Sequence, residues 1–171
     1  MRETITYLEM SAFDELRPGR VVAEVALEPL TPESPLIKSM QERIGTPYAW
    51  PSARRTDAEW AAVLARPLRR FLLITYQGEP AGFVDFEFDA DGGVEITTFG
   101  LVPEYVGRGL GGHALTLAVR AAWAAAPAGA EQVRRVWLHT SSLDHPNALP
   151  NYRSRGFRPF RTRVNERPDE P

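Results

Sequence analysis

Four closely spaced glycines between positions 107 and 112 form the segment of this 171-residue chain best suited to bind a charged ligand. They follow an apolar stretch, 94–102, that predicts a strand, and they precede 114–123, which predicts a helix. Backbone N–H groups at the start of a helix have no internal partner, and the helix dipole adds partial positive charge there. Glycine lets an anion approach these amides closely. The loop therefore predicts a phosphate or pyrophosphate site. A turn that only reverses the chain is the alternative, although one or two glycines would suffice for it.

The glycine loop differs from two common nucleotide-binding loops. It lacks the Gly-Lys-Ser/Thr ending of a P-loop, and the spacing of Gly107, Gly109, Gly111 and Gly112 does not fit the dinucleotide fingerprint. The loop also lies in the middle of the chain rather than after a first strand. Arg108 adds a positive charge for a charge-assisted contact with phosphate. A nucleotide-dependent enzyme of another kind is a less favoured interpretation.

The strand end and the loop together resemble motif A of the GNAT superfamily of acyl-CoA N-acyltransferases. The run 101–105, Leu-Val-Pro-Glu-Tyr, matches the family's lead-in, and Gly109 and Gly111 match its two small positions. Val106 stands where the family usually has Gln or Arg. Because the backbone does most of the binding in this loop, we expect the change to cost little.

A second match lies near the other end of the chain, in the order that the family requires. Residues 145–157 resemble the motif Asn-x-x-Ala-x-x-x-Tyr-x-x-x-Gly-Phe, with Tyr152 and Gly156 in register. His145 replaces the usual Asn, and Asn147 follows two residues later. The resemblance covers about residues 71–162 well and residues 1–70 only in general layout.

The resemblance implies acetyl-CoA as cofactor, with its pantetheine arm paired to the strand before the loop. It also implies that the two central parallel strands splay apart. Because a glycine inside a strand often marks a bulge, we expect Gly100 to be the bulge that starts the splay; a glycine that only relieves packing is the alternative. The implied cofactor-binding residues lie in the strand, the loop and the start of the last helix: Phe99, Gly100, Leu101, Val102, Val106, Gly107, Arg108, Gly109, Leu110, Gly111, Gly112, His145 and Asn147.

Acyl transfer to an amine needs a proton acceptor for the amine and a proton donor for the leaving thiolate. Tyr152 stands where the family commonly places that donor; a tyrosine packed in the core is the alternative. Glu95 is the candidate base, acting directly or through water, because strict alternation puts it on one face with Phe99 and Leu101. His139 on the next strand and a water chain are the alternative bases. Glu95 could instead be an exposed carboxylate at the end of a strand with no catalytic role.

Composition and charge exclude several classes of protein. The chain has no cysteine, which removes disulfides, a cysteine nucleophile and thiolate metal sites together. No run of eighteen apolar residues and no signal-peptide core are present, so we expect a cytoplasmic protein without a membrane span. The three histidines lack metal-ligand spacing, so no metal is expected. A net charge of −2 does not suggest nucleic-acid binding, although residues 104–164 carry an excess of arginine that suits a polyanionic cofactor. Scattered surface charge is the alternative.

The order of predicted elements indicates an α/β fold with a mixed, predominantly antiparallel sheet and helices on both faces. Strands are expected at 4–10, 21–27, 71–76, 81–88, 94–102, 133–140 and 157–164, with helices near 36–44, 56–65 and 146–155 besides the one after the loop. A crossover helix makes the strand at 133–140 parallel to the one at 94–102. We expect one domain over 1–164, with 1–70 on the acceptor side, 71–162 holding the cofactor, and 165–171 as a frayed tail.

The leading interpretation is thus an N-acetyltransferase that acts on a primary amine by direct transfer in a ternary complex. A non-catalytic domain that binds or senses acyl-CoA is the alternative. The resemblance implies that the first helices and their connection wall the acceptor pocket. That region contains Tyr48, Trp50, Pro51 and Trp60, with the carboxylates of Asp57 and Glu59 nearby. Trp60 fits a core position equally well. Members of the family often form homodimers, and the sequence names no surface for one.

Overall fold

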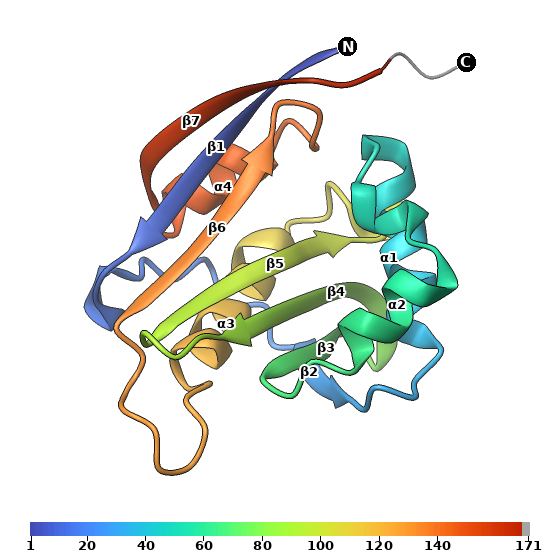
Figure 1. The fold of residues 1–171 in the computed structure, drawn as a ribbon. Coiled ribbons are helices and arrows are strands. Elements are labelled where there is room, and N and C mark those ends of the chain that lie inside the picture. The colour runs from blue at the N-terminus through green and yellow to red at the C-terminus, as the bar shows by residue number, and fades with distance from the viewer. Residues whose placement is uncertain (169–171) are drawn as a thin grey trace.

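The computed structural model describes residues 1–168, which form a seven-stranded mixed sheet flanked by helices (Figure 1). The strands are β1 (Arg2–Met10), β2 (Val25–Leu30), β3 (Arg69–Tyr76), β4 (Glu79–Phe88), β5 (Gly93–Leu101), β6 (Arg135–Ser141) and β7 (Arg158–Glu166). The helices are α1 (Leu36–Gly45), α2 (Asp57–Leu64), α3 (Gly111–Trp123) and α4 (Ala148–Ser154). The strand order is β2-β3-β4-β5-β6-β1-β7, and within the described residues only β5 and β6 pair in parallel. The predicted fold class is confirmed.

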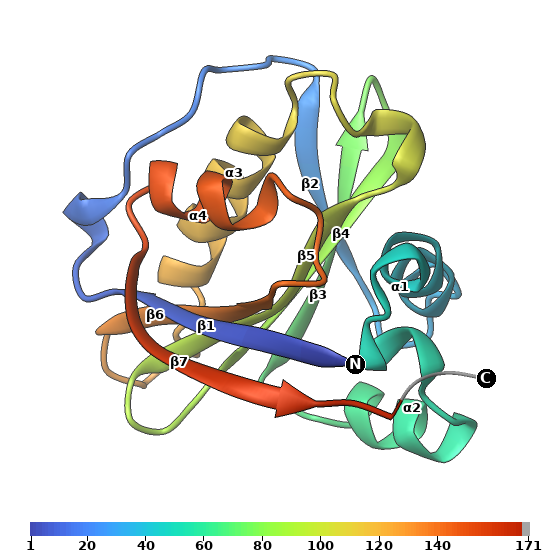
Figure 2. The ribbon, with the colours of Figure 1, turned by 90° about the horizontal axis from the view of Figure 1, so that it is seen from above.

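Separate apolar cores lie on the two faces of the sheet. On one face, α3 and α4 cover a core that joins Leu115 to Val84 and other buried strand residues. On the other face, α1 and α2 cover a smaller core in which Met40 and Trp60 join Phe83. Figure 2 shows the two pairs of helices on opposite sides of the strands. The face covered by α3 and α4 is called the α3/α4 face below, and the opposite one the α1/α2 face.

Local signals set several of the element boundaries. Thr56 accepts a hydrogen bond from the backbone N–H of Glu59, whose carboxylate accepts one from the N–H of Thr56, so the predicted capping box starts α2. The hairpin between β3 and β4 turns at Gln77 and Gly78, which have φ values of 53° and 80°. Two positive φ values are what a type I′ turn requires, and this turn matches the twist of the flanking strands.

Two expected boundaries are wrong. The strand expected at 21–27 runs instead from Val25 to Leu30, because the chain closes a turn from Val25 N–H to the Val22 carbonyl before it pairs with β3. The frayed tail does not begin at Asn165. Asn165 and Arg167 both donate to the buried carboxylate of Glu3, which anchors the chain there. Residues 169–171 of the expected tail lie outside the described residues.

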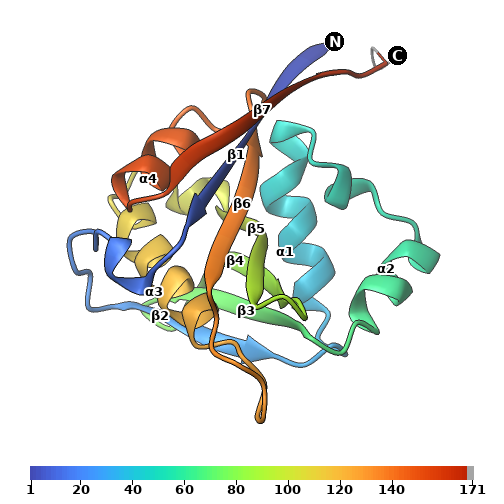
Figure 3. The same cartoon turned by 60° about the vertical axis from the view of Figure 1, so that its left-hand side comes forward.

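The amino-terminal strand lies between the last two strands of the chain (Figure 3). β1 is antiparallel to both neighbours, with Tyr7 opposite His139 of β6 and Arg161 of β7. At the end of this ladder, the Met1 amino group donates to the Arg167 carbonyl at 2.7 Å. The two ends of the chain therefore close one half of the sheet together.

A buried ion pair joins β3 to β4 beneath α1. Arg69 Nε donates to Asp85 Oδ2 at 2.8 Å, and both side chains are almost completely buried. The Asp85 carboxylate also accepts from the hydroxyl of Thr98 on β5. Gln41 of α1 donates to Thr98 Oγ1 at 2.8 Å and accepts from Ser52 at 3.0 Å. One carboxylate thus links three strands to the helix that covers them.

We expect Arg69→Met to lower the free energy of unfolding by about 3–5 kcal/mol, because it leaves the Asp85 carboxylate buried without its cation. Adding Asp85→Leu should recover much of that loss, since the uncompensated charge is then removed. Urea denaturation of the single and double variants measures both effects. Arg66→Met is the matched control: it breaks the exposed Arg66–Glu87 pair and should change stability little. Equal losses at Arg66 and Arg69 would contradict this account.

Candidate active site at the split between β5 and β6

The two central strands separate soon after they pair. β5 and β6 are paired only where Gly93–Glu95 lie beside Arg135–Trp137. β5 stays paired with β4 as far as Leu101, whereas β6 stays paired with β1 as far as Ser141. From residue 96 onward, the edge of β5 that faces β6 therefore has no strand partner. The splayed central strands expected from the family resemblance are confirmed.

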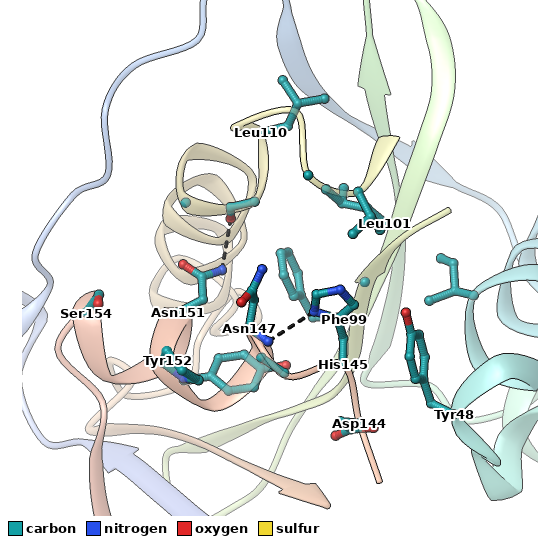
Figure 4. A pocket seen from close by; sticks show the side chains of 18 of the residues that line it. Tyr48, Phe99, Leu101, Leu110, Asp144, His145, Asn147, Asn151, Tyr152 and Ser154 are labelled. Atoms are coloured by element: carbon teal, nitrogen blue, oxygen red, sulfur yellow. Dashed lines mark hydrogen bonds between the residues drawn. The ribbon is translucent and has the colours of Figure 1, made fainter. Parts of the chain in front are cut away.

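A pocket of about 430 Å³ opens where the strands separate, within the usual size range of small-molecule sites (Figure 4). The end of β5, the glycine loop, the first turns of α4 and the segment after α1 bound it. Most of the residues predicted from the sequence line this pocket: Phe99, Gly100, Leu101, Val106, Gly107, Gly109, Leu110, Gly111, Gly112, His145, Asn147 and Tyr152.

Helix α3 begins in the wall of the pocket without a side-chain cap. The loop before it turns at Gly107 and Gly109, whose φ values of 77° and 78° suit glycine and strain other residues. The first helical hydrogen bond is donated by Ala114 to the Leu110 carbonyl, so the preceding amides have no helical acceptor. The pocket wall therefore offers bare N–H groups and the positive end of a helix dipole to an anion.

Val102 and Arg108, two of the predicted cofactor residues, do not line the pocket. Val102 is fully buried in the core beneath α1, and its N–H donates to the Ala81 carbonyl at 2.9 Å. The Arg108 guanidinium lies over the rings of Tyr105 and Tyr76, 5.1 and 5.4 Å from their centroids. A contact between Arg108 and a ligand phosphate therefore stays a prediction.

The bulge in β5 is at Thr97, and the expectation of a bulge at Gly100 is wrong. Ile96 and Thr98 pair with neighbouring residues of β4, so Thr97 between them has no cross-strand partner. Gly100 serves packing instead. A Cβ at this position would come within 2.5 Å of Ile44 Cγ2, so the missing side chain lets α1 approach the strand.

The bulge places Glu95 and the pocket residues of β5 on opposite faces. Glu95 lies on the α1/α2 face, opposite Glu87 in the β4–β5 ladder. Phe99 and Leu101 pack in the core of the α3/α4 face, where the Phe99 ring meets that of Tyr152 at 6.4 Å between centroids. The expectation that Glu95 shares a face with Phe99 and Leu101 is therefore wrong, because one unpaired residue reverses the alternation.

Glu95 and His139 lie together on the α1/α2 face, with Nε2 of the histidine 3.9 Å from a carboxylate oxygen. Burial raises the pKa of the Glu95 carboxyl; the Arg69 guanidinium opposes this, and the Asp85 and Glu87 carboxylates add to it. Burial lowers the pKa of His139, so its ring is neutral near pH 7. Neither side chain lines the pocket, and both lie beside the point where β5 and β6 part.

Tyr152 lies on the α3/α4 side of the pocket, only 7% exposed. Its ring packs edge-on against both Phe99 and Phe157. Burial raises the pKa of its hydroxyl well above the usual range, and the Asp144 carboxylate adds to the shift. Within residues 1–168, the hydroxyl has no hydrogen-bond partner. It therefore stays protonated at neutral pH and free to donate to a ligand.

Asp144 is a pocket residue that the sequence reasoning missed. Its carboxylate accepts hydrogen bonds from Trp50 Nε1 at 2.7 Å and from the backbone N–H of Ser141 at 3.0 Å, and also from the hydroxyl of Thr140. These contacts bring together the end of β6 and the segment after α1, which are far apart in the sequence. Nothing in the local sequence around Asp144 indicates them.

The residues expected to wall an acceptor pocket do not all lie at the pocket. Tyr48 and Trp50 line the pocket, but Trp60 is buried in the core, which was its alternative reading. Asp57 and Glu59 are exposed at the start of α2, away from the pocket lining. Asp144 is thus the carboxylate that lies beside the two aromatic rings.

His145 shapes the entry to α4. Its Nδ1 accepts a hydrogen bond from the backbone N–H of Asn147 at 3.0 Å, and its ring meets the edge of Tyr48 (Figure 4). Asn151, one turn into the helix, donates to the Gly111 carbonyl at 3.1 Å. α4 is therefore tied to the start of α3 across the pocket. In the described part of the chain, no three His, Asp or Glu side chains gather as a metal would require, and no helix has the length and apolarity to cross a bilayer.

Comparison with known proteins agrees with this geometry. The model of the acetyltransferase (GNAT) family matches residues 37–157. No curated protein matches the chain in sequence. Solved structures with a similar fold include a GCN5-related N-acetyltransferase from Kribbella flavida, at 21% identity and a TM-score of 0.62. That alignment covers 94% of this chain and 56% of the other. Another from Sphaerobacter thermophilus has 17% identity and a TM-score of 0.65, over 95% of this chain and 50% of that one.

The structural likeness, at such low identity, concerns the fold alone, and this chain spans about half the length of these two proteins. The family match covers well over half of the chain and begins within α1, earlier than the motifs alone indicated. It includes the glycine loop, the split strands and the whole of α4, which together form much of the pocket. The chain belongs to the GNAT acetyltransferase family.

Proposed function

We propose that this protein transfers an acetyl group from acetyl-CoA to a primary amine by direct transfer within a ternary complex. The observation that carries the proposal is the pocket at the split in the sheet, which has uncapped helix amides at one end and the buried hydroxyl of Tyr152 at the other. Acetyl-CoA supplies the activated acyl group as a thioester. The acceptor is a small molecule or a peptide amine.

The residues of the pocket fit this cofactor. From Phe99 to Leu101, the edge of β5 that faces β6 has no strand partner. The backbone groups on that edge are therefore available to the amides of a pantetheine arm. A Cβ at Gly107 would meet nothing within 4 Å, and one at Gly111 would meet only Asn151 Nδ2 at 3.6 Å. The space beside the loop amides is therefore open to a pyrophosphate.

Tyr152 is the proposed donor to the leaving sulfur. Its raised pKa keeps the hydroxyl protonated across the neutral range, and it has no competing partner among the described residues. Such a group donates a hydrogen bond to sulfur as negative charge develops there, which lowers the barrier more than it lowers the energy of the bound substrate.

Glu95 is the proposed base, with water carrying the amine proton to it. The carboxylate lies on the α1/α2 face beside the strand split, and its raised pKa brings it closer to the working pH. His139, at 3.9 Å and neutral, is the alternative acceptor for the same proton. Acid and base then approach the acyl group from opposite faces of the sheet.

The acceptor side of the pocket supports a cationic amine as substrate. Tyr48 and Trp50 line it together with the carboxylate of Asp144, which has no cationic partner among the described residues. Aromatic faces and a carboxylate together attract an ammonium group. A domain that binds acyl-CoA without turnover would need the glycine loop and the separated strands, but it would not need aromatic rings and a carboxylate placed to bind an amine.

Calorimetry with acetyl-CoA tests the cofactor. We expect micromolar binding to the wild type and none to Gly111→Glu, because a carboxylate would stand among the amides that face the pyrophosphate. Gly111→Gln, of equal size and no charge, should bind more tightly than Gly111→Glu, so the difference reports on charge. Gly111 has no positive φ and its added Cβ meets no close neighbour, so both variants should fold. A folded wild type that fails to bind would overturn the proposal.

Tyr152→Phe should bind acetyl-CoA as the wild type does and lose about 10²-fold in kcat, because it removes only the donor to sulfur. Release of the coenzyme A thiol in the presence of a panel of primary amines measures turnover. Tyr76→Phe is the matched control, since Tyr76 packs against Tyr105 outside the pocket lining. Unchanged turnover in Tyr152→Phe would remove this residue from the mechanism.

The base is tested by the pH profile of kcat/KM. A carboxylate acts as base only when ionised, so activity should fall as the pH drops through the raised pKa of Glu95, above the ordinary value of 4.5. Glu95→Gln should lose this acid limb together with about 10²-fold in rate. Glu87→Gln, at the cross-strand neighbour, should keep the rate and the limb, with the limb moved to lower pH because one carboxylate that raises the pKa of Glu95 is gone. If His139→Gln abolishes the limb and Glu95→Gln does not, the histidine is the base.

A further inference from the structure

Two arginine side chains lie beside the glycine loop, and neither is at a defining position of the two family motifs. Arg155, at the end of α4, lines the pocket, and its Nη1 lies against Gly112, so closely that a Cβ there would collide with it. Arg20, in the segment between β1 and β2, places its Nη2 only 3.2 Å from where a Cβ on Gly109 would stand. Both guanidinium groups therefore lie at the start of α3.

Neither guanidinium has a partner among residues 1–168. Arg155 Nε is buried and makes no hydrogen bond, and no carboxylate of the described residues lies within ion-pair distance of Arg20 or Arg155. Some other arginines have carboxylate partners, as Arg43 does with Glu104 and Arg158 with Glu15. Two unpaired cations beside the positive end of a helix repel it, and a bound anion relieves that repulsion.

The packing of the chain holds Arg20 in this place. The backbone N–H of Gly19 donates to Thr116 Oγ1 on α3 at 2.9 Å, and the N–H of Arg17 donates to the Arg155 carbonyl at 2.8 Å. A Cβ on Gly19 would lie 2.5 Å from Arg155 Nη1 and 2.7 Å from the carbonyl carbon of Gly112. The segment thus lies directly on the ends of α3 and α4, and Gly19 leaves the space that the Arg155 guanidinium fills.

We propose that Arg20 and Arg155 bind the 3′-phosphate of coenzyme A. The inference rests on the proposed function and adds a second phosphate subsite to it. Each phosphate of the pyrophosphate bridge carries about one negative charge, which suits the neutral amides of the loop. A terminal phosphomonoester carries nearly two at pH 7 and is matched by guanidinium groups, which also suit its geometry. The two arginines come from segments far apart in the sequence and converge only in the fold.

The test compares coenzyme A with 3′-dephospho-coenzyme A, which lacks this phosphate alone, by calorimetry. The wild type should bind coenzyme A at least tenfold more tightly. Arg20→Gln and Arg155→Gln should each weaken coenzyme A binding by about tenfold and leave the dephospho form nearly unchanged. The double variant should bind the two ligands about equally, which closes a thermodynamic cycle on the phosphate.

Arg17→Gln and Arg153→Gln are the matched controls. Arg17 lies in the same segment as Arg20, and Arg153 lies on α4, at whose end Arg155 stands, but neither lines the pocket. Each variant removes one positive charge and should still bind coenzyme A more tightly than the dephospho form. Thermal unfolding of every variant verifies that it folds. Equal losses for both ligands would assign the arginines to the pyrophosphate and overturn the proposal, as would a wild type that binds both ligands alike. Binding of neither ligand would instead overturn the proposed function, and this inference with it.

Discussion

The early separation of β5 from β6 is the constraint on which the rest of the molecule depends. A sheet normally satisfies its backbone groups by continuous pairing. Here β5 keeps only its partner on the β4 side beyond Glu95, while β6 follows β1. The bulge at Thr97 bends β5 just where the separation begins. The glycine loop, α4 and the segment after α1 then gather around the strand edge that is left without a partner.

One unpaired residue also decides which chemistry each face of the sheet presents. Because Thr97 interrupts the alternation, β5 turns Glu95 toward His139 on one face and Phe99 toward Tyr152 on the other. Burial raises the pKa of both the Glu95 carboxyl and the Tyr152 phenol. The same shift has opposite consequences, because it moves the pKa of the carboxyl toward the neutral range and that of the phenol away from it. Glu95 is thereby suited to accept a proton, and Tyr152 is suited to keep its own.

Local sequence signals predicted the elements and the loop, because each depends on neighbours along the chain. The capping box at Thr56, the turn at Gly78 and the glycines before α3 are such signals. The bulge could not be predicted in this way, since threonine is an ordinary strand residue and its register depends on β4. Asp144 and Arg20 became visible only once distant segments met. The polar carboxyl-terminal stretch was misjudged because its partner, the buried Glu3, lies at the other end of the chain.

The position of β1 between β6 and β7 has a consequence for how the chain reaches this fold. Tyr7 has to find His139 and Arg161, so the contact order of this half of the sheet is high. β1 leaves the ribosome long before either of its partners, so its apolar Leu8 and Met10 wait uncovered until β6 and β7 have been synthesised. The strands β3, β4 and β5 are joined by adjacent hairpins and have no such delay.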